Sequence, residues 1–368
     1  MAGGSTILVT LTDVLRYRLH YGANFGSVFV LERWLSGSMY TTNTTGESEL
    51  AAVQGWVASQ GLDATRQRFE QHWTQYISDN DLDWLKNTGK CNTVRVPIGY
   101  FTLGQQHCNG TPFQAVAPVY ANAWVAVRSL VQRCRSRRIG VLLDFHALPG
   151  GANTGIHSGT DSGKAELWTS TSYLNLAKSC LCFIAQAAKS MDGVVGIQLV
   201  NEAITNAPGM YPWYDSILSS LSQIDSTMPI YISDGWNLTQ AIAYVQQKNC
   251  SKTLNTCPVV IDTHCYWCFS DADKAKTAQT IISQVPQCLC ELDNKDGDVV
   301  DRGAAQVFVG EYSCVLDGST WQKSASTTQS KTTLVNQFGQ AQDNRFLQRA
   351  GGCCFWTYRN YVGFLNVI

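Results

Sequence analysis

Two glutamates in this sequence stand just beyond short apolar runs. Glu202 comes after the run Val194–Val200, and Glu311 comes after the run Val307–Gly310. A pair of carboxylates can cleave a glycosidic bond through an oxocarbenium-like transition state, and the two are about 5–5.5 Å apart when the anomeric configuration is retained. Glutamates at strand ends can also be ordinary capping or ion-paired residues. The context therefore gives a hypothesis of glycoside cleavage, with capping as its alternative.

Polar or aromatic residues stand at or near the ends of the other apolar runs as well. Asn201 could hydrogen-bond a sugar 2-hydroxyl, and Arg95 could lie below Glu311 and keep it ionised. If the runs are strands of a parallel barrel, their carboxyl ends meet at the face where such barrels hold their active sites. The residues expected at this shared site are Asn24, Arg95, Asp144, His146, Asn201, Glu202, Asp234, His264, Glu311 and Trp356.

The elements that must position these side chains are short apolar runs alternating with amphipathic segments. Short apolar runs are typical of buried strands, and helical spacing predicts helices. Eight strands alternating with helices predict an α/β fold, a (β/α)8 TIM barrel forming a single domain over residues 1–368. The predicted strands are Leu19–Ala23, Thr93–Pro97, Gly140–Phe145, Val194–Val200, Pro229–Ser233, Val259–His264, Val307–Gly310 and Cys353–Trp356. The predicted helices are Asp79–Thr88, Tyr120–Arg138, Ser172–Lys189, Trp213–Ile224, Lys274–Ser283 and Thr333–Arg349, and the predicted loops are Thr41–Glu49 and Ser319–Lys331.

The composition is that of a globular chain with almost no net charge. Hydrophobic residues make up 45% of the 368 residues, and 27 basic residues balance 28 acidic ones to a net charge of −1. This balance does not favour a nucleic acid or an anionic membrane as a partner. No apolar run approaches the roughly 18 residues that a membrane span needs. We expect a monomer without either partner.

Cysteines and glycosylation sequons favour an extracellular protein. The chain has 14 cysteines, which is more than proteins of a reducing compartment usually carry. Their even number permits up to seven disulfides, whose connectivity the sequence leaves open. Residues 1–13 lack the basic and apolar regions of a signal peptide, so we expect that one was removed from a secreted protein. A cytosolic protein with many free thiols is the alternative. The N-x-[ST] sequons are at Asn43, Asn109, Asn237 and Asn249.

Other chemistries find little support in the sequence. Cys265 and Cys268 have redox or zinc spacing, but the second pair that a zinc site needs does not follow, so disulfides are the expected fate of both. The chain has neither a nucleotide-binding glycine motif nor a G-x-S-x-G elbow. Because hydrolysis by two carboxylates needs no metal, we expect neither a metal nor a cofactor.

Seven short motifs, in order along the chain, resemble the family 5 glycoside hydrolases of clan A, in particular their fungal secreted branch. The resemblance runs from about Gly22 to Tyr358. It rests on Gly22–Ser27 with Leu31–Trp34, Asn92–Tyr100, Asp144–Gly150, Asn201-Glu202, His264-Cys-Tyr266, Gly310-Glu311 and Phe355–Tyr358. No single motif is decisive, but their common order is specific.

The resemblance implies a role for each matching position. Glu202 corresponds to the acid/base, Glu311 to the nucleophile, and Arg95 to the arginine that supports the nucleophile. The enzyme would be a retaining β-glycosidase that acts by double displacement. The remaining positions imply a pocket for the non-reducing-end glucose, made by Glu32, His146, Asn153, Asn201, His264, Tyr266 and Trp356.

One stretch departs from the exo-β-1,3-glucanases of that branch. The string from Asn153 to Trp168 is closer to the rutinosidases, which release rutinose from flavonoid glycosides such as rutin. We therefore expect a 6-O-α-rhamnosyl-β-glucosidase, with an exo-β-1,3-glucanase and a non-catalytic carbohydrate-binding barrel as alternatives. Only twelve residues follow Trp356, so an abbreviated eighth helix is also expected. Candidates for an aromatic mouth around a flat aglycone are Tyr211, Trp213, Trp236, Trp267 and Phe269.

Overall fold

The eight predicted strands form one closed parallel barrel. The computed structural model describes residues 9–250, 256–293, 305–325 and 329–359. Each strand pairs with its neighbours in chain order, and β8 returns to β1, so the predicted (β/α)8 TIM barrel is confirmed. Observed and predicted strand ends differ by at most two residues. The strands are β1 (His20–Asn24), β2 (Thr93–Gly99), β3 (Gly140–Ala147), β4 (Val194–Gln198), β5 (Ile230–Ser233), β6 (Val259–Cys265), β7 (Val307–Tyr312) and β8 (Gly352–Phe355).

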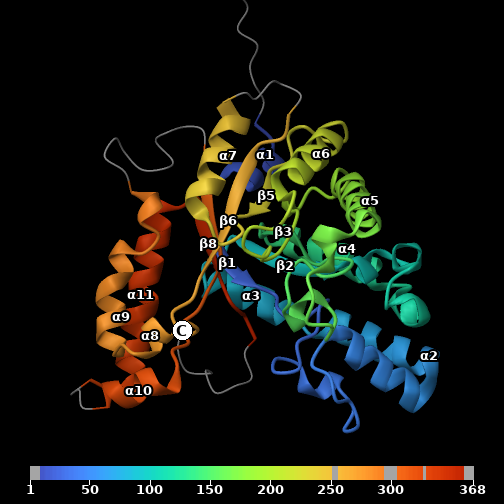
Figure 1. Ribbon diagram of the computed structural model, residues 1–368, viewed down its shortest axis with the longest axis horizontal. Coiled ribbons are helices and arrows are strands. Elements are labelled where there is room, and N and C mark those ends of the chain that lie inside the picture. Colours follow the sequence, from blue (N-terminus) through green and yellow to red (C-terminus); the bar gives the residue numbers. More distant parts are fainter. Residues whose placement is uncertain (1–8, 251–255, 294–304, 326–328, 360–368) are drawn as a thin grey trace, which may run out of the picture.

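Helices surround these strands, with α2 and the group α8 to α11 on opposite sides of the barrel (Figure 1). Five of the six predicted helices are single helices, α3, α4, α5, α6 and α11, although α4 begins three residues later and α6 three residues earlier than predicted. The sequence prediction missed α1, α2 and α7. The helices are α1 (Leu11–Tyr17), α2 (Glu49–Gln75), α3 (Asp79–Asn87), α4 (Ala123–Ser136), α5 (Thr171–Ala188), α6 (Met210–Ser222), α7 (Leu238–Cys250), α8 (Asp271–Lys274), α9 (Ala278–Gln284), α10 (Gly318–Ser324) and α11 (Lys331–Arg349).

Two predictions near the end of the chain were wrong in part. The predicted helix Lys274–Ser283 is two short helices, because Thr277 caps a new helix with its side chain. The predicted loop Ser319–Lys331 includes most of α10. Asp317 caps that helix, and Ser324 is buried and accepts a hydrogen bond from the backbone of α9 at 2.8 Å. Polar residues that form hydrogen bonds between two packed helices therefore make a helix look like a loop when only the sequence is read.

The barrel interior is layered. Its apolar floor is formed by one side chain from most strands, and Leu15 of α1 closes it from below. The polar layer above it is centred on Arg95, which is fully buried. The floor residues are Leu15, Leu142, Val195, Tyr231, Val260, Phe308 and Cys354.

A bulge in β7 directs Glu311 toward the barrel mouth. The β6–β7 register shifts between Thr263 and His264, so that His264 pairs with Glu311. A side chain on Gly310 would come within 1.9 Å of Asp262 Oδ1, so this position must be glycine. Such bulges bend a strand and re-aim the next side chain.

Twelve of the described cysteines, all except Cys257, are free thiols, Cys265 and Cys268 among them, so the expected disulfides are not formed by these twelve. Most are buried on separate elements, where cysteine packs as a small apolar residue. Burial raises the pKa of Cys134, for example, to about 12. One of the two grounds for expecting secretion is therefore not met in the described part of the chain, and secretion stays a prediction.

The four sequons differ in their surroundings. Asn43, Asn109 and Asn237 are exposed, as an attached glycan requires. Asn249 is partly buried, and its amide bonds both to the carbonyl and to the N–H of Val259, at 3.0 and 3.1 Å. A glycan on Asn249 would remove these bonds to β6. Among the described helices, none has the length and apolar character to cross a membrane.

Candidate active site

Arg95 is the centre of the polar layer below the barrel mouth. Its guanidinium donates to Gln198 Oε1 at 2.9 Å, to Asn201 Oδ1 at 2.7 Å, and to Asn24 Oδ1 at 2.9 Å. It also pairs with Asp144 Oδ2 at 3.0 Å. Burial would lower the pKa of Arg95, but the surrounding carboxylates raise it above its usual value. A permanent cation is therefore fixed at the base of the site.

Glu311 is held by two donors. Nη1 of Arg95 donates to its Oε1 at 2.8 Å, and the Tyr266 hydroxyl donates to its Oε2 at 2.6 Å. Burial raises the pKa of Tyr266 well above its usual value, so this phenol keeps its proton and remains a donor. Charge-assisted bonds of this kind are short and fix the carboxylate plane.

Glu202 lies just past the end of β4 with its backbone in a left-handed conformation, at φ 45°. Its Oε1 lies 2.8 Å from Nδ1 of His264, and its Oε2 lies 3.3 Å from Nε2 of His157. Burial would raise the pKa of Glu202, but His157 and His264 hold it well below its usual range. The site therefore favours the ionised form of Glu202 when no substrate is bound.

His264 joins the two glutamates. Its Nδ1 lies 2.8 Å from Glu202 and 3.5 Å from Glu311, and its Nε2 lies 3.1 Å from Asp262 Oδ2. Burial would lower the pKa of His264, but Glu311, Asp262 and Glu202 raise it well above its usual value. The interacting atoms of Glu202, His264 and Glu311 all lie within 4.8 Å of one another.

These three residues are also the described set whose spacing would suit a metal ion. Each of them is already bonded to protein partners, Glu311 by two donors and His264 through both ring nitrogens. An imidazole that faces a carboxylate on each side donates from both nitrogens and has no lone pair left for a metal. The arrangement is therefore a hydrogen-bonded network.

The expected glucose pocket has a flat wall. His146 stacks on the Trp356 indole at 5.9 Å with an interplanar angle of 10°. His146 Nδ1 lies 2.6 Å from Asp144, and its Nε2 lies 3.4 Å from the amide nitrogen of Asn201. Glu32 is buried in the loop after β1 and accepts a hydrogen bond from Trp34 at 2.9 Å. Burial raises the pKa of Glu32.

Asn153 lies next to Glu202 and holds the loop that follows β3. Its Nδ2 donates to the Glu202 carbonyl at 3.0 Å, and its Oδ1 accepts from the N–H of Gly155 at 2.8 Å and from the Ser158 hydroxyl at 2.9 Å. The amide is therefore used to hold its own loop against Glu202. In the described structure Asn153 positions this loop, and its expected contact with a sugar stays a prediction.

The structure adds three residues that the sequence analysis did not expect at the site, Gln198, Asp262 and His157. Asn24 and Gln198 fix the orientation of Arg95, and Gln198 also donates to Asp262 at 2.6 Å. Asp262 and His264 are two residues apart on one strand, so their side chains point to the same face. This spacing was visible in the sequence and could have identified Asp262. His157 carried no such signal, because it lies on a loop.

The proposed aromatic mouth is only partly formed by its candidates. Trp236 and Phe269 are 51% and 71% exposed and pack edge-on against His264 and Tyr266. Trp213 is buried, Tyr211 packs on Tyr244 at 4.6 Å, and Trp267 is half-buried, so these three belong to the packing around the site. Trp34, which is 42% exposed beside Glu32, is an unpredicted member of the mouth.

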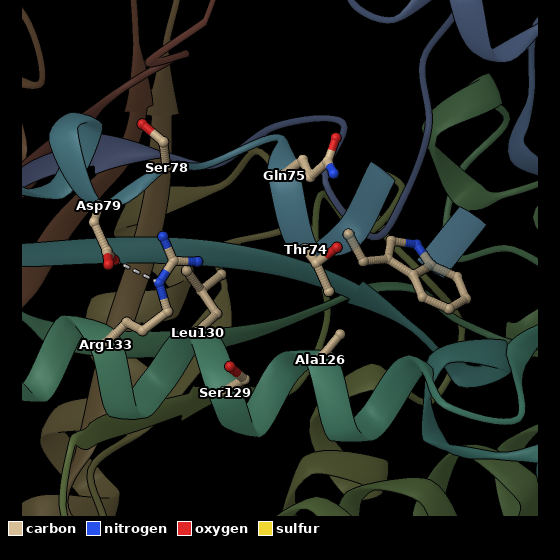
Figure 2. A pocket seen from close by; sticks show the side chains of 9 residues that line it. Thr74, Gln75, Ser78, Asp79, Ala126, Ser129, Leu130 and Arg133 are labelled. Carbon is tan, nitrogen blue, oxygen red and sulfur yellow. Dashed lines mark hydrogen bonds and ion pairs between the residues drawn. The ribbon is translucent and has the colours of Figure 1, made fainter. Parts of the chain in front are cut away.

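The cavities near and far from this network differ in size. A cavity of about 10 Å³ between Glu202, Trp236 and His264 is large enough for one water. A larger one of about 420 Å³ lies outside the barrel, between the end of α2, the start of α3 and α4. Arg133 and Asp79 form an ion pair at 2.8 Å across it (Figure 2). None of the expected site residues lines that outer cavity.

The barrel and the paired carboxylates at its mouth define a glycoside hydrolase of the retaining type. The sequence profile of "Cellulase (glycosyl hydrolase family 5)" matches residues 57–361. A Schizosaccharomyces pombe protein named glucan 1,3-beta-glucosidase 3 is 33% identical over 94% of this chain and 70% of its own length. The chain belongs to glycosyl hydrolase family 5, and it is a retaining β-glycosidase.

Further similarities agree with this membership. An uncharacterized glycosyl hydrolase of Saccharomyces cerevisiae is 33% identical over 96% of this chain and 69% of its own length. Among solved structures, the rutinosidase from Aspergillus niger superposes with a TM-score of 0.71 at 16% identity, covering 93% of this chain and 90% of the other. At that identity the likeness concerns the fold.

Proposed function

We propose that this protein is an exo-acting β-glucosidase of β-1,3-glucan, with Glu202 as acid/base and Glu311 as nucleophile. The observation that carries the proposal is the pair of carboxylates, whose oxygens lie within 4.8 Å at the barrel mouth. A separation this short leaves no room for a water between sugar and carboxylate, which favours direct attack and retention.

The two roles follow from the partners of each glutamate. Glu311 accepts from the Arg95 guanidinium and from Tyr266, so its carboxylate is oriented and suited to attack the anomeric carbon. The described partners of the Glu202 carboxylate are two imidazoles, a type of group that can exchange protons near neutral pH. These neighbours suit the acid/base of a retaining enzyme, which must donate a proton in the first step and accept one in the second.

We expect the side chains beside the pair to bind one glucosyl unit. The Trp356 indole can support the apolar face of the ring, and the Asn201 amide, oriented by Arg95, can donate to the 2-hydroxyl. Buried Glu32 can accept from hydroxyls on the far side of the ring. The exposed Trp34, Trp236 and Phe269 offer platforms for the rest of a glycan.

Two observations bear on the substrate. The relative named glucan 1,3-beta-glucosidase 3 is similar over nearly the whole chain at 33% identity, which supports a glucan. A rutinoside is supported by the string from Asn153 to Trp168 and by a likeness in fold at 16% identity. We therefore place the glucan first and reverse the order in which the sequence alone ranked the two.

The test is a product analysis with laminaribiose, laminarin and rutin. Glucose from the first two, released first as the β-anomer in proton NMR, is the expected result. Rutinose from rutin would move the assignment to the diglycosidases, and an initial α-anomer would refute retention.

Two active-site variants and one surface variant test the roles. Glu311→Gln should lose turnover by several orders of magnitude and still bind glucose, and Glu202→Gln should be rescued by azide on an activated aryl β-glucoside. Glu166→Gln, an exposed position outside the site, is the matched control and should keep wild-type rates. Normal turnover by Glu311→Gln would overturn the assignment.

A further inference from the structure

His157 stands against the proposed acid/base, although none of the family motifs in this sequence includes it. It lies in the turn Ile156–Ser158 between β3 and α5. Its Nε2 is 3.3 Å from Glu202 Oε2, and its ring packs edge-on against His146 at 5.4 Å. The same nitrogen is shielded from solvent and has no well-aligned hydrogen bond in the described structure, so its contact with Glu202 is an ion pair.

The loop fixes the ring from both sides. Before His157, the Asn153 side chain binds Gly155 and Ser158, as described above. After it, the carbonyl of Gly159 accepts from the first turn of α2 at 3.1 Å. Asp161 accepts from the backbone N–H two residues before α2 at 2.8 Å. His157 is therefore held in place and is not a free surface side chain.

The two oxygens of Glu202 are not equivalent. Oε1 faces Nδ1 of His264, whose Nε2 faces Asp262. With a carboxylate at each nitrogen, His264 is a double donor, so Oε1 of Glu202 is an acceptor. The proton that Glu202 gives to a leaving group must then be carried by Oε2, the oxygen that faces His157.

Carboxylates dominate the surroundings of His157. Glu202 from β4, Glu32 from the loop after β1 and Glu311 from β7 act on it, and His146 of β3 is the facing ring. Burial would lower the pKa of His157, but these carboxylates raise it to about 9. A neutral-pH site without substrate therefore has its proton on His157 and a carboxylate at Glu202.

We propose that His157 exchanges a proton with Oε2 of Glu202 and so sets the pH range in which Glu202 acts as an acid. The proposal rests on the proposed function. In the first step the Nε2–H bond breaks as the Oε2–H bond forms; that proton passes to the glycosidic oxygen as its bond to the anomeric carbon breaks and Glu311 attacks. In the second step water gives a proton to Oε2 as its oxygen bonds to the anomeric carbon and the bond from that carbon to Glu311 breaks, and the proton returns from Oε2 to Nε2. His157 acts through Glu202 and is a positioning residue.

Kinetics of His157→Asn give the first test, with Thr154→Ala as the control from an exposed position of the same loop. With a poor leaving group such as methyl β-glucoside, kcat/KM at pH 8 should fall about 10- to 100-fold, the lower range for loss of acid catalysis. With 2,4-dinitrophenyl β-glucoside, which needs no proton, it should stay within about 3-fold. The basic limb of the pH profile should move down by at least one pH unit, and Thr154→Ala should match wild type throughout.

Equal losses on both substrates with an unmoved basic limb would overturn the proposal, because they would indicate a merely structural or sugar-binding role. Thermal unfolding of His157→Asn shows whether the fold is intact. If that variant fails to fold, the second test decides.

The second test needs no turnover. A histidine ring NMR titration of the wild-type protein should place the pKa of His157 well above that of an exposed histidine. In Glu202→Gln it should fall by at least one unit. An unchanged titration would refute the proton exchange even if the enzyme is active. A wild-type protein that cleaves no β-glycoside would refute the proposed function. In that case the titration alone would decide whether His157 and Glu202 exchange a proton.

Discussion

Replacement of Arg95 by lysine keeps the positive charge at the base of the site but removes the planar, forked arrangement of hydrogen-bond donors. The guanidinium is fully buried and serves five acceptors: Gln198 at 2.9 Å, Asn24 at 2.9 Å, Asn201 at 2.7 Å, Glu311 at 2.8 Å and Asp144 at 3.0 Å. An ammonium has three donors on a single atom. At least two acceptors therefore lose their partner in a region that water does not reach.

The size of the effect follows from that count. A buried acceptor without a partner costs about 1–3 kcal/mol, so Arg95→Lys should lower the free energy of unfolding by about 2–6 kcal/mol. If the lysine nitrogen moves away from Glu311, the nucleophile loses one preorganised donor. Loss of such a donor typically costs about 100- to 1000-fold in kcat.

Two assays separate these effects. Urea unfolding measures the stability loss, and turnover of an aryl β-glucoside, well below the unfolding transition, measures kcat. Arg18→Lys serves as the control, because that arginine donates to backbone carbonyls at the barrel bottom, away from the site. A stability loss under 1 kcal/mol together with a kcat within 3-fold of wild type would show that the forked geometry of Arg95 is dispensable, contrary to this reasoning.

Three further changes have defined outcomes. Tyr266→Phe removes the 2.6 Å donor to Glu311 and should lower kcat about 100-fold, measured with the same aryl glucoside. Trp356→Ala removes the stacking wall and should weaken glucose binding in calorimetry about 10-fold; unchanged affinity would place the sugar elsewhere. Burial raises the pKa of Glu49 to about 7 from 4.5, so the folded protein retains a proton that the unfolded chain loses. The contribution of Glu49 to stability should therefore be greatest below pH 4.5 and fall by about 3 kcal/mol up to pH 7, measured by chemical denaturation as the difference between wild type and Glu49→Gln.

The sequence was informative wherever a side chain belongs to a strand. Strand residues alternate between two faces, so apolar runs fixed the barrel and the residues at their ends fell together at its mouth. The same rule places Asp262 below His264 on one face, and Asp144 below His146. Arg95 could be placed beside Glu311 for this reason, and the 2.8 Å bond agrees.

It was least informative where contacts join distant loops. The amide of Asn153 was expected to face the sugar, but the hydroxyl of Ser158 and the carbonyl of Glu202 occupy it. The position of His157 depends on these hydrogen bonds of Asn153 and on the hydrogen bond between Asp161 and the backbone just before α2, more than a hundred residues away in the chain. No local pattern records such contacts. Cysteine pairing could not be predicted for a similar reason, since the number of thiols says nothing of the distances between them.

The proton balance of the site is likewise a property of distances. In this cluster three cationic groups meet five carboxyl groups, so a proton bound anywhere among them is stabilised by its neighbours. A lone buried glutamate would keep its own proton through desolvation; here the imidazoles take it, and Glu202 must draw it back when a leaving group develops charge. Acid strength therefore belongs to the cluster and not to Glu202 alone, and the loss of either imidazole should change the pH dependence of both chemical steps. The groups are Arg95, His157 and His264 with Glu32, Asp144, Glu202, Asp262 and Glu311.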